Sequence, residues 1–265
     1  MNKDRCILST AGLGGVWGKV DPQEPVDTLI AALEAGISAI DTAPAYGDAE
    51  LYVGKALQLW QGQRPKVSTK VGRLKSFSAY EGYYDYTGKG MQQSVEQSLN
   101  TLGLPELDIL FLHDPTVILP EQADEVIETL LSFKMKGYTR QIGLGGNPPE
   151  WFGKYLQPEI FDVAMEFNKL NACSTVALHQ NLPFYIHNKI KYFAASPLNI
   201  GLLGSNFESF TVNPPIWLDK KYLETAIKIK DIADRYHMPL HTLAHRFLLS
   251  LPHAFQIVIG ASNQQ

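Results

Sequence analysis

IDTAPAYGDAE, at residues 40–50 of this 265-residue chain, passes from the end of an apolar run into a loop that carries polar residues. Asp41 closes a short β-rich run directly after Ile40, and Tyr46 follows five positions later, beyond a proline. An apolar run that ends abruptly in polar residues is typical of a buried strand whose end carries functional side chains. The same pattern recurs along the chain.

Short β-rich runs alternate with stretches of helical periodicity. In PVDTLIAALEAG, at residues 25–36, apolar residues lie at helical spacing and Gly36 marks the end of the helix. MQQSVEQSLNTLG (91–103) and EQADEVIETLLSFKMKG (121–137) repeat the scheme and also end in glycine. The β-rich runs are residues 7–10, 38–41, 66–70, 107–113, 141–144, 163–167, 190–194 and 255–259.

This alternation predicts βα units and a parallel sheet. Eight strands in about 250 residues suit a (β/α)8 TIM barrel, formed by residues 1–265 as a single α/β domain. A doubly wound Rossmann fold is the competitor, but it places a GxGxxG turn after its first strand. The sequence GLGG at residues 12–15 lacks the third glycine at that spacing, and we therefore favour the barrel.

The composition excludes several classes of protein. A net charge of −4 with no long run of one sign gives no electrostatic basis for binding nucleic acid or an anionic membrane. The two cysteines lack CxxC spacing, so no metal site is predicted and a reducing compartment fits best. The N-terminus has no signal-peptide core, and no apolar run approaches the ~20 residues of a membrane span. We therefore expect a cytoplasmic protein.

Four polar residues fall where a barrel carries its chemistry, at the carboxyl ends of strands. Asp41 ends the second run, and Tyr46 lies in the loop beyond it. Lys70 ends the third run and His113 the fourth. Each has an ordinary structural role, such as a helix cap, a surface ring, a solvated amine or a core imidazole. Three successive strands that end in ionisable groups at one mouth are better explained by catalysis.

Hydride transfer to a carbonyl explains this set. The alkoxide that forms needs a proton, which Tyr46 can supply although a free tyrosine has a pKa of about 10. The ammonium of Lys70 would lower that pKa, and Asp41 would hold the lysine by an ion pair. His113 would orient the carbonyl through a neutral ring nitrogen.

In these and further segments the chain resembles the aldo-keto reductase family. The segments are AIDTAPAYGDAE, VSTKVGR, LDILFLHDP, RQIGLGGN, AASPLNIGLLG and VIGAS, in family order over nearly the whole chain. The resemblance implies a (β/α)8 barrel that binds NADP or NAD without a Rossmann motif. It assigns the catalytic tetrad to Asp41, Tyr46, Lys70 and His113. Members of the family normally continue past the eighth strand into a last helix, which we expect this domain to lack.

The resemblance also implies cofactor contacts. Asn147 matches the position that holds the nicotinamide amide, and a helix cap or turn explains it equally well. The predicted cofactor-binding residues are Gly146, Asn147, Ser196, Pro197, Leu198, Gly201 and Ser262. The chain departs from the family pattern at Ala195, where many members have a tyrosine that stacks on the nicotinamide. DVAMEFN (162–168) also lacks the usual glutamine, and its Glu166 faces either the site or solvent.

The missing tyrosine and the opening GLGGVWG (12–18) are similar to the sugar dehydrogenase branch of the family, of the L-galactose or L-fucose dehydrogenase kind. The resemblance implies a small carbonyl or sugar substrate, oxidised as an aldose or reduced as an aldehyde, in contact with Trp17, Tyr46 and His113. Trp17 and the aromatic loop AYEGYYDYTG (79–88) either line a sugar pocket or simply cover the barrel mouth. An oligomer is compatible with the sequence.

Two other functions remain open. A Schiff-base aldolase would use Lys70 as a nucleophile, but it needs a lysine free of a carboxylate partner, and Asp41 argues against that. A regulatory or interaction subunit would keep the cofactor with little turnover, and the intact tetrad argues only weakly against it. NAD and NADP are not distinguished, because the family reads the 2′-phosphate in its last helix.

Overall fold

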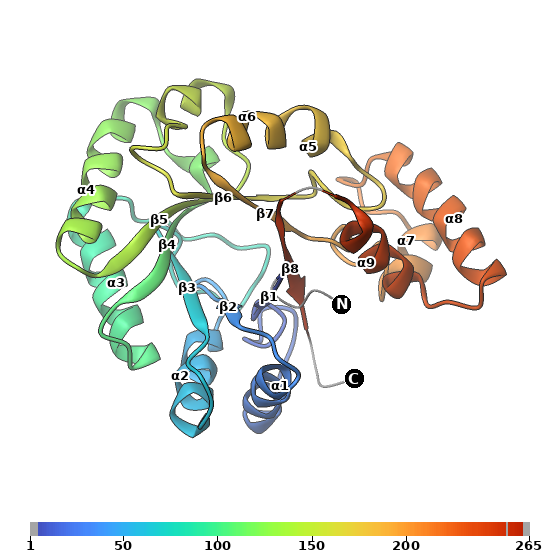
Figure 1. Cartoon of the computed structure of the whole chain (residues 1–265), viewed down its shortest axis with the longest axis horizontal. Coiled ribbons are helices and arrows are strands. Elements are labelled where there is room, and N and C mark those ends of the chain that lie inside the picture. The colour runs from blue at the N-terminus through green and yellow to red at the C-terminus, as the bar shows by residue number, and fades with distance from the viewer. Residues whose placement is uncertain (1–4, 253, 262–265) are drawn as a thin grey trace.

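Eight parallel strands close into a barrel in the computed structural model, which describes residues 5–252 and 254–261 (Figure 1). Each strand pairs with the next along the chain, and the last returns to pair with the first. The strands are β1 (Cys6–Ser9), β2 (Ala39–Asp41), β3 (Lys66–Val71), β4 (Leu107–His113), β5 (Thr139–Gly145), β6 (Val163–Phe167), β7 (Lys191–Ala195) and β8 (Gln256–Gly260). The predicted (β/α)8 fold is confirmed, and each of the expected runs overlaps one strand.

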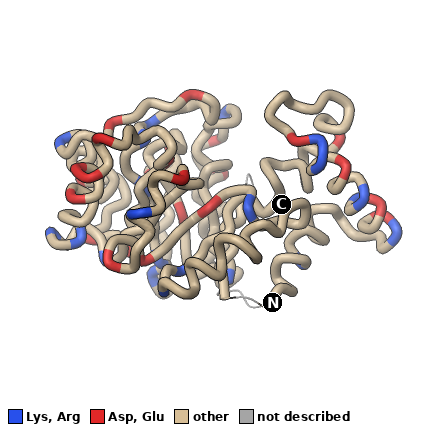
Figure 2. Tube along the Cα trace, turned by 90° about the horizontal axis from the view of Figure 1, so that it is seen from above, with Lys and Arg blue, Asp and Glu red and all other residues tan. Residues whose placement is uncertain are grey.

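Helices form the outer layer of the barrel (Figure 1). They are α1 (Gln23–Glu34), α2 (Ala49–Leu59), α3 (Gly88–Leu102), α4 (Ala123–Met135), α5 (Val176–His179), α6 (Asn181–His187), α7 (Phe207–Val212), α8 (Lys220–Arg235) and α9 (Leu240–Ser250), with the 3-10 turns η2 (Pro115–Val117), η3 (Pro120–Gln122) and η4 (Glu150–Tyr155). Figure 2 shows positive and negative residues interspersed along these helices, without a block of one sign. Within the described ranges, none of the helices combines the length and the hydrophobicity that a bilayer crossing requires.

Local sequence signals set the ends of the helices. α3 begins after Thr87, whose Oγ1 accepts a hydrogen bond from the backbone N–H of Gly90 at 3.1 Å. It ends at Gly103, whose φ of 67° is a left-handed conformation that glycine adopts without steric cost. The glycines expected to end α1 and α4, Gly36 and Gly137, have φ values of 91° and 75°. The glycine pattern in the sequence therefore marked real helix ends.

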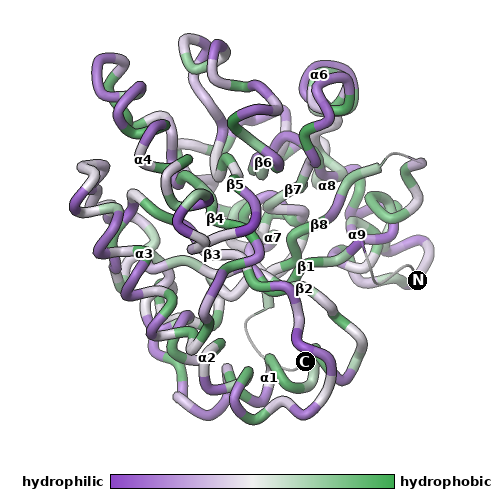
Figure 3. The backbone as a smooth tube through the Cα atoms, turned by 60° about the vertical axis from the view of Figure 1, so that its left-hand side comes forward, coloured by the Kyte–Doolittle hydropathy of each residue, from purple (hydrophilic) through white to green (hydrophobic). Residues whose placement is uncertain are grey.

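The core lies in two layers. A buried cluster fills the inside of the barrel, formed by Ile7, Ile109, Phe111, Val163, Met165, Phe193 and Val258. At Gly143 an added Cβ would stand 2.3 Å from the ring of Phe111, so glycine leaves room for this ring inside the barrel. The second layer packs the apolar faces of the helices on the strands, and Figure 3 shows hydrophobic residues concentrated along the strands. This rigid frame holds the strand ends that carry the polar residues.

The connection between β7 and β8 departs most from the regular alternation. It holds three helices, α7, α8 and α9, and Figure 1 shows α8 standing away from the barrel wall. These helices have their own apolar cluster, which includes Leu203, Phe207 and Ala233. Ile257 of β8 is fully buried and belongs to one cluster with Leu248 of α9. α9 therefore covers part of the last strand.

Candidate active site

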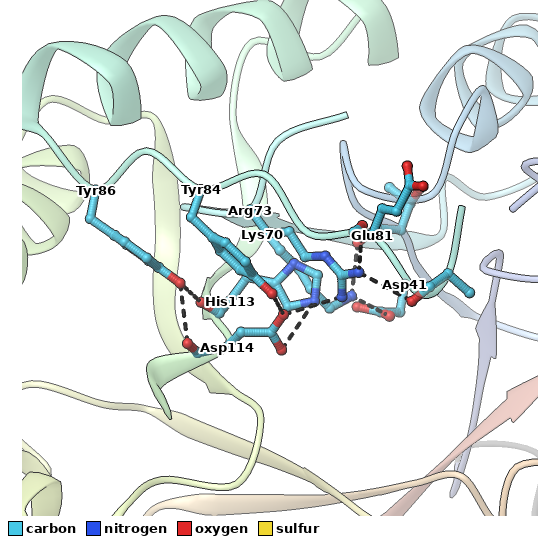
Figure 4. Close-up of polar contacts among 10 residues, drawn as sticks. Asp41, Lys70, Arg73, Glu81, Tyr84, Tyr86, His113 and Asp114 are labelled. Carbon is cyan, nitrogen blue, oxygen red and sulfur yellow. Dashed lines mark hydrogen bonds and ion pairs between the residues drawn. The ribbon is translucent and has the colours of Figure 1, made fainter. Parts of the chain in front are cut away.

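A buried ion pair joins the ends of β2 and β3. Lys70 Nζ lies 2.6 Å from Asp41 Oδ2 and donates a second hydrogen bond to the backbone oxygen of Thr42 at 2.9 Å (Figure 4). Ser68 Oγ donates to the other carboxylate oxygen of Asp41 at 2.8 Å. Burial lowers the pKa of Lys70, but the charge of Asp41 and the proximity of Tyr46 outweigh it, and the net pKa is raised. Lys70 is therefore an ammonium at neutral pH.

Tyr46 lies directly over this pair. Lys70 Nζ stands 4.6 Å from the centre of the half-buried Tyr46 ring. Burial raises the pKa of Tyr46, and the Lys70 ammonium acts against it in the expected direction, although burial is the larger effect. The loop carrying Tyr46 rests on Gly14, where an added Cβ would lie 1.6 Å from the Tyr46 backbone oxygen. The GLGG sequence thus holds the tyrosine loop in place.

His113 completes the predicted tetrad. Its ring meets the Tyr46 ring edge to face, with centres 6.1 Å apart. Burial, followed by the charges of Lys70 and Arg73, holds the pKa of His113 well below its usual range, so the ring is neutral at neutral pH. The Nδ1 atom is buried and has no hydrogen-bond partner among the described residues. The structure brings the four predicted residues together at one end of the barrel.

A second polar network beside His113 was missed by the sequence reasoning (Figure 4). Arg73 Nη1 and the Tyr84 hydroxyl each donate to Asp114 Oδ2 at 3.2 Å. The Tyr86 hydroxyl donates to the backbone oxygens of His113 at 2.7 Å and Asp114 at 3.1 Å. The motifs VGR and HDP carried a signal for it, because each places a charged residue close to a predicted catalytic one.

The loop after β3 is anchored by the same arginine. Arg73 Nη2 donates to the backbone oxygens of Ala79 at 3.3 Å and Glu81 at 3.2 Å. The Ala79 N–H donates in turn to the oxygen of Val16 at 3.1 Å, in the loop that carries Trp17. The Trp17 side chain is 61% exposed. The two aromatic loops predicted at the mouth are therefore joined to each other.

The predicted cofactor residues lie after β5 and β7. Asn147 joins the loop after β5 to the end of β6, because its Nδ2 donates to the Phe167 oxygen and its Oδ1 accepts from the Phe167 N–H, both at 3.2 Å. These bonds reach another strand and are neither a helix cap nor a local turn. Gly146 has a φ of 134° and packs against the Asp114 turn. Ser262 lies outside the described residues.

The turn after β7 has an unusual backbone. Ser196 and Gly201 have φ values of 56° and 87°, and the segment includes the buried Pro197 and the half-buried Leu198. Asn168, at the neighbouring end of β6, donates its backbone N–H to Ala195 at 3.3 Å. Its Oδ1 is buried and has no partner among the residues the structure describes. A buried free acceptor at this place fits the amide N–H of a nicotinamide.

Glu166 is buried and lines a pocket that also contains Asn147. Its side chain is 1% exposed and lies between β6 and α6. Oε1 accepts hydrogen bonds from Asn181 Nδ2 and from the Tyr185 hydroxyl, both at 3.0 Å. Burial raises the pKa of this carboxyl, against the lowering effect of these donors. Glu166 is a part of the wall behind the barrel mouth.

Comparison with known proteins identifies the family of the chain. Residues 6–265 match the model of the aldo/keto reductase family. The chain is 33% identical to L-galactose dehydrogenase of Arabidopsis thaliana over 213 residues, which are 77% of this chain and 63% of that relative. It is 26% identical to D-threo-aldose 1-dehydrogenase of a Pseudomonas species over 95% of this chain and 83% of the relative.

A solved structure shows the same fold. The glycerol dehydrogenase of Gluconobacter oxydans superimposes with a TM-score of 0.78 at 24% identity, over 100% of this chain and 88% of that one. The chain spans less than two thirds of the length of the Arabidopsis relative, so this match does not by itself assign that enzyme's activity to the chain. The match of the family model covers nearly the full length. The chain therefore belongs to the aldo/keto reductase family, a family of oxidoreductases.

Proposed function

We propose that this protein transfers a hydride between NAD or NADP and an aldose, or a small aldehyde or alcohol, with Tyr46 as the acid and base. One observation carries the proposal. The buried ion pair of Lys70 and Asp41 lies under the Tyr46 ring, which in turn meets a neutral His113. Few reactions need a tyrosine supported in this way, and carbonyl reduction is one of them.

Each residue of the tetrad has a distinct task in this proposal. When bound, the nicotinamide supplies or accepts the hydride. Tyr46 gives its proton to the carbonyl oxygen during reduction and recovers it during oxidation. Lys70 stabilises the tyrosinate, and Asp41 keeps the lysine charged and in place. Neutral His113 orients the carbonyl by donating a ring N–H.

The cofactor proposal uses the strand ends next to the tetrad. The unpaired Oδ1 of Asn168 would accept a hydrogen bond from the nicotinamide amide. The backbone at Ser196, Pro197 and Leu198 would contact the adjoining part of the cofactor. Asn147 supports this surface by holding the end of β6. Gly146, Gly201 and Ser262 complete the proposed contact set. Both NAD and NADP are compatible with it.

The proposed substrate is an aldose or a small carbonyl compound. Its support is the likeness to relatives named as L-galactose and D-threo-aldose dehydrogenases, together with the aromatic loops at the mouth. Trp17 would contact such a substrate through its exposed ring. We propose the cytoplasm as its place of action, because Cys6 and Cys173 are free thiols.

The aldolase alternative loses support from the geometry. A Schiff-base lysine has a lowered pKa so that its neutral amine can attack, whereas the pKa of Lys70 is raised by its carboxylate partner. A regulatory subunit that binds the cofactor without turnover is an alternative that the experiment below separates.

Cofactor titration and turnover test the proposal. NADH and NADPH are each titrated by nucleotide fluorescence, and the protein is then assayed on a panel of aldoses with NAD or NADP. We expect binding and turnover, with Tyr46→Phe lowering kcat by roughly 10²–10⁴-fold and barely changing nucleotide affinity. Binding without turnover on any substrate would favour the regulatory subunit. Full activity in Tyr46→Phe would remove the tyrosine from the mechanism.

A further inference from the structure

Asp114 has an unusual backbone conformation directly after the predicted catalytic histidine. Its φ and ψ are 50° and 62°, a left-handed conformation that is uncommon outside glycine. In an extended strand, consecutive side chains point to opposite faces. Here the turn brings the carboxylate back beside the imidazole, and Asp114 Oδ1 lies 3.9 Å from His113 Nε2. Strained residues of this kind are concentrated at functional sites.

The two oxygens of this carboxylate differ in their partners. Oδ2 accepts from Arg73 and from the Tyr84 hydroxyl, which fix the orientation of the group (Figure 4). Oδ1 has no hydrogen-bond donor within reach in the part of the chain that the structure describes, since His113 Nε2 at 3.9 Å is too far. The Asp114 side chain is 21% exposed. Oδ2 is thus paired within the protein, whereas Oδ1 has no hydrogen-bond partner among the described residues.

We propose that Asp114 is a substrate-binding residue whose Oδ1 accepts a hydrogen bond from a hydroxyl on the carbon next to the reacting carbon. A carboxylate only accepts hydrogen bonds, so it selects a substrate group that donates one. His113 holds the reacting oxygen and Asp114 the neighbouring hydroxyl, which together define 2-hydroxyaldehydes and aldoses as the substrate class. This inference rests on the proposed function.

Two aldehydes of similar size test the inference. Glyceraldehyde carries hydroxyls on C2 and C3 and propanal carries neither, and kcat/KM is measured for both, per concentration of free aldehyde, with NADH and with NADPH. We expect the wild-type protein to favour glyceraldehyde by roughly 10–100-fold, the usual value of a hydrogen bond to a charged group. Asp114→Asn keeps an oxygen for Arg73 and tolerates the left-handed turn. It should reduce the preference by about tenfold or more.

Matched variants separate substrate binding from loop anchoring. Asp234→Asn removes the same charge from an exposed ion pair with Lys230 on α8 and should change neither rate. Tyr84→Phe removes one of the two donors that orient the carboxylate, so it should lower the preference for glyceraldehyde, but less than Asp114→Asn does. If Asp114→Asn lowers both rates equally, Asp114 serves only to anchor the loop and the inference is wrong.

A substrate change gives a test that needs no variant. Methoxyacetaldehyde keeps an oxygen next to the reacting carbon but cannot donate a hydrogen bond, whereas glycolaldehyde can. The wild-type protein should favour glycolaldehyde by about tenfold or more. Equal rates on these two, or on glyceraldehyde and propanal, would overturn the role of Asp114 and leave the hydride-transfer proposal intact. No reduction of any aldehyde with either nucleotide would instead reject the proposed function itself.

Discussion

Lys70 acts on two neighbours at once, because its ammonium lies between the Asp41 carboxylate and the Tyr46 ring. The carboxylate compensates for the loss of water around the buried ammonium. The ammonium in turn favours the ionised form of the phenol, against the effect of burial. In the proposed mechanism, this charge lowers the pH at which Tyr46 would act as a base, against the larger effect of burial.

Lys70→Met should shift the pH dependence of oxidation. The ammonium lowers the pKa of Tyr46, so its removal leaves burial unopposed and that pKa rises. The onset of kcat/KM for alcohol oxidation should therefore move to higher pH, with a severe loss of activity below it. A pH profile measured on the variant and on Lys134→Met, which loses only a surface ion pair, checks this. Coincident profiles for Lys70→Met and the wild-type protein would rule out the electrostatic role.

Glu166→Gln should stabilise the protein at neutral pH and not in acid. Burial raises the folded-state pKa of Glu166 above its unfolded value, so the carboxyl favours folding when protonated and loses that contribution as pH rises through the folded pKa. Glutamine removes the buried charge, and its gain in unfolding free energy should grow between pH 4 and pH 7. Urea unfolding across this range measures it, with the exposed Glu159→Gln as control. A gain independent of pH would contradict the account.

At the scale of elements, α2 and α3 approach each other closely at one glycine. An added Cβ on Gly54 would lie 2.3 Å from the backbone oxygen of Thr101, which cannot move without shifting the helix. Strand ends and helix ends follow local sequence rules, but this contact depends on how two helices meet. The hydrophobic periodicity of α2 or of α3 alone therefore does not predict this contact.

Gly54→Ala should destabilise the protein by about 1–3 kcal/mol, the usual cost of overpacking. Gly153→Ala is the matched control, since a Cβ there meets nothing within 4 Å. Urea unfolding midpoints of both variants, compared with the wild-type protein, decide the matter. Equal midpoints for the two variants would mean that the helices separate without cost.

The difference between local sequence rules and contacts between elements also explains which site residues the sequence could predict. Asp41 and His113 end their strands and Lys70 is next to the last residue of β3, and parallel strands bring such ends to one mouth. Asp114 was not predictable, because its role depends on a left-handed turn and on Arg73, which comes from another strand end. The environment of Glu166 was ambiguous for a similar reason. The alternation of side chains along β6 tells which face of the sheet Glu166 is on, but not that α6 packs on that face.

At the scale of the whole molecule, closure of the barrel joins the first strand to the last. β1 and β8 pair in register from Cys6 with Ile257 to Ser9 with Gly260. Arg5, just before β1, donates from its guanidinium to the backbone oxygens of Leu249 at 3.1 Å and Leu251 at 3.3 Å, and it stacks on Phe255. The strand order was predictable from the sequence, whereas this side-chain contribution to closure was not.

Arg5→Ala should lower the unfolding free energy by about 1–3 kcal/mol, because carbonyl groups near the end of α9 lose their donor. The unfolding free energy of Arg5→Lys should lie between those of the wild-type protein and Arg5→Ala, since a lysine keeps the charge but not the planar set of donors. Urea unfolding of both is compared with Arg235→Ala, which removes an exposed arginine from α8. If Arg5→Ala is no less stable than Arg235→Ala, the closure does not depend on this contact.

The pairing of β1 with β8 has a consequence for the nascent chain. β1 is made before its partner strand, which follows about 250 residues later along the chain. Ribosomal synthesis at roughly 5–20 residues per second leaves one edge of β1 unpaired for on the order of 10–50 s. Free strand edges pair with other chains, and neighbouring ribosomes on one messenger RNA carry further copies of the nascent chain. With four residues, β1 offers little to such contacts, and a longer first strand would aggregate during translation even where it strengthened the finished barrel.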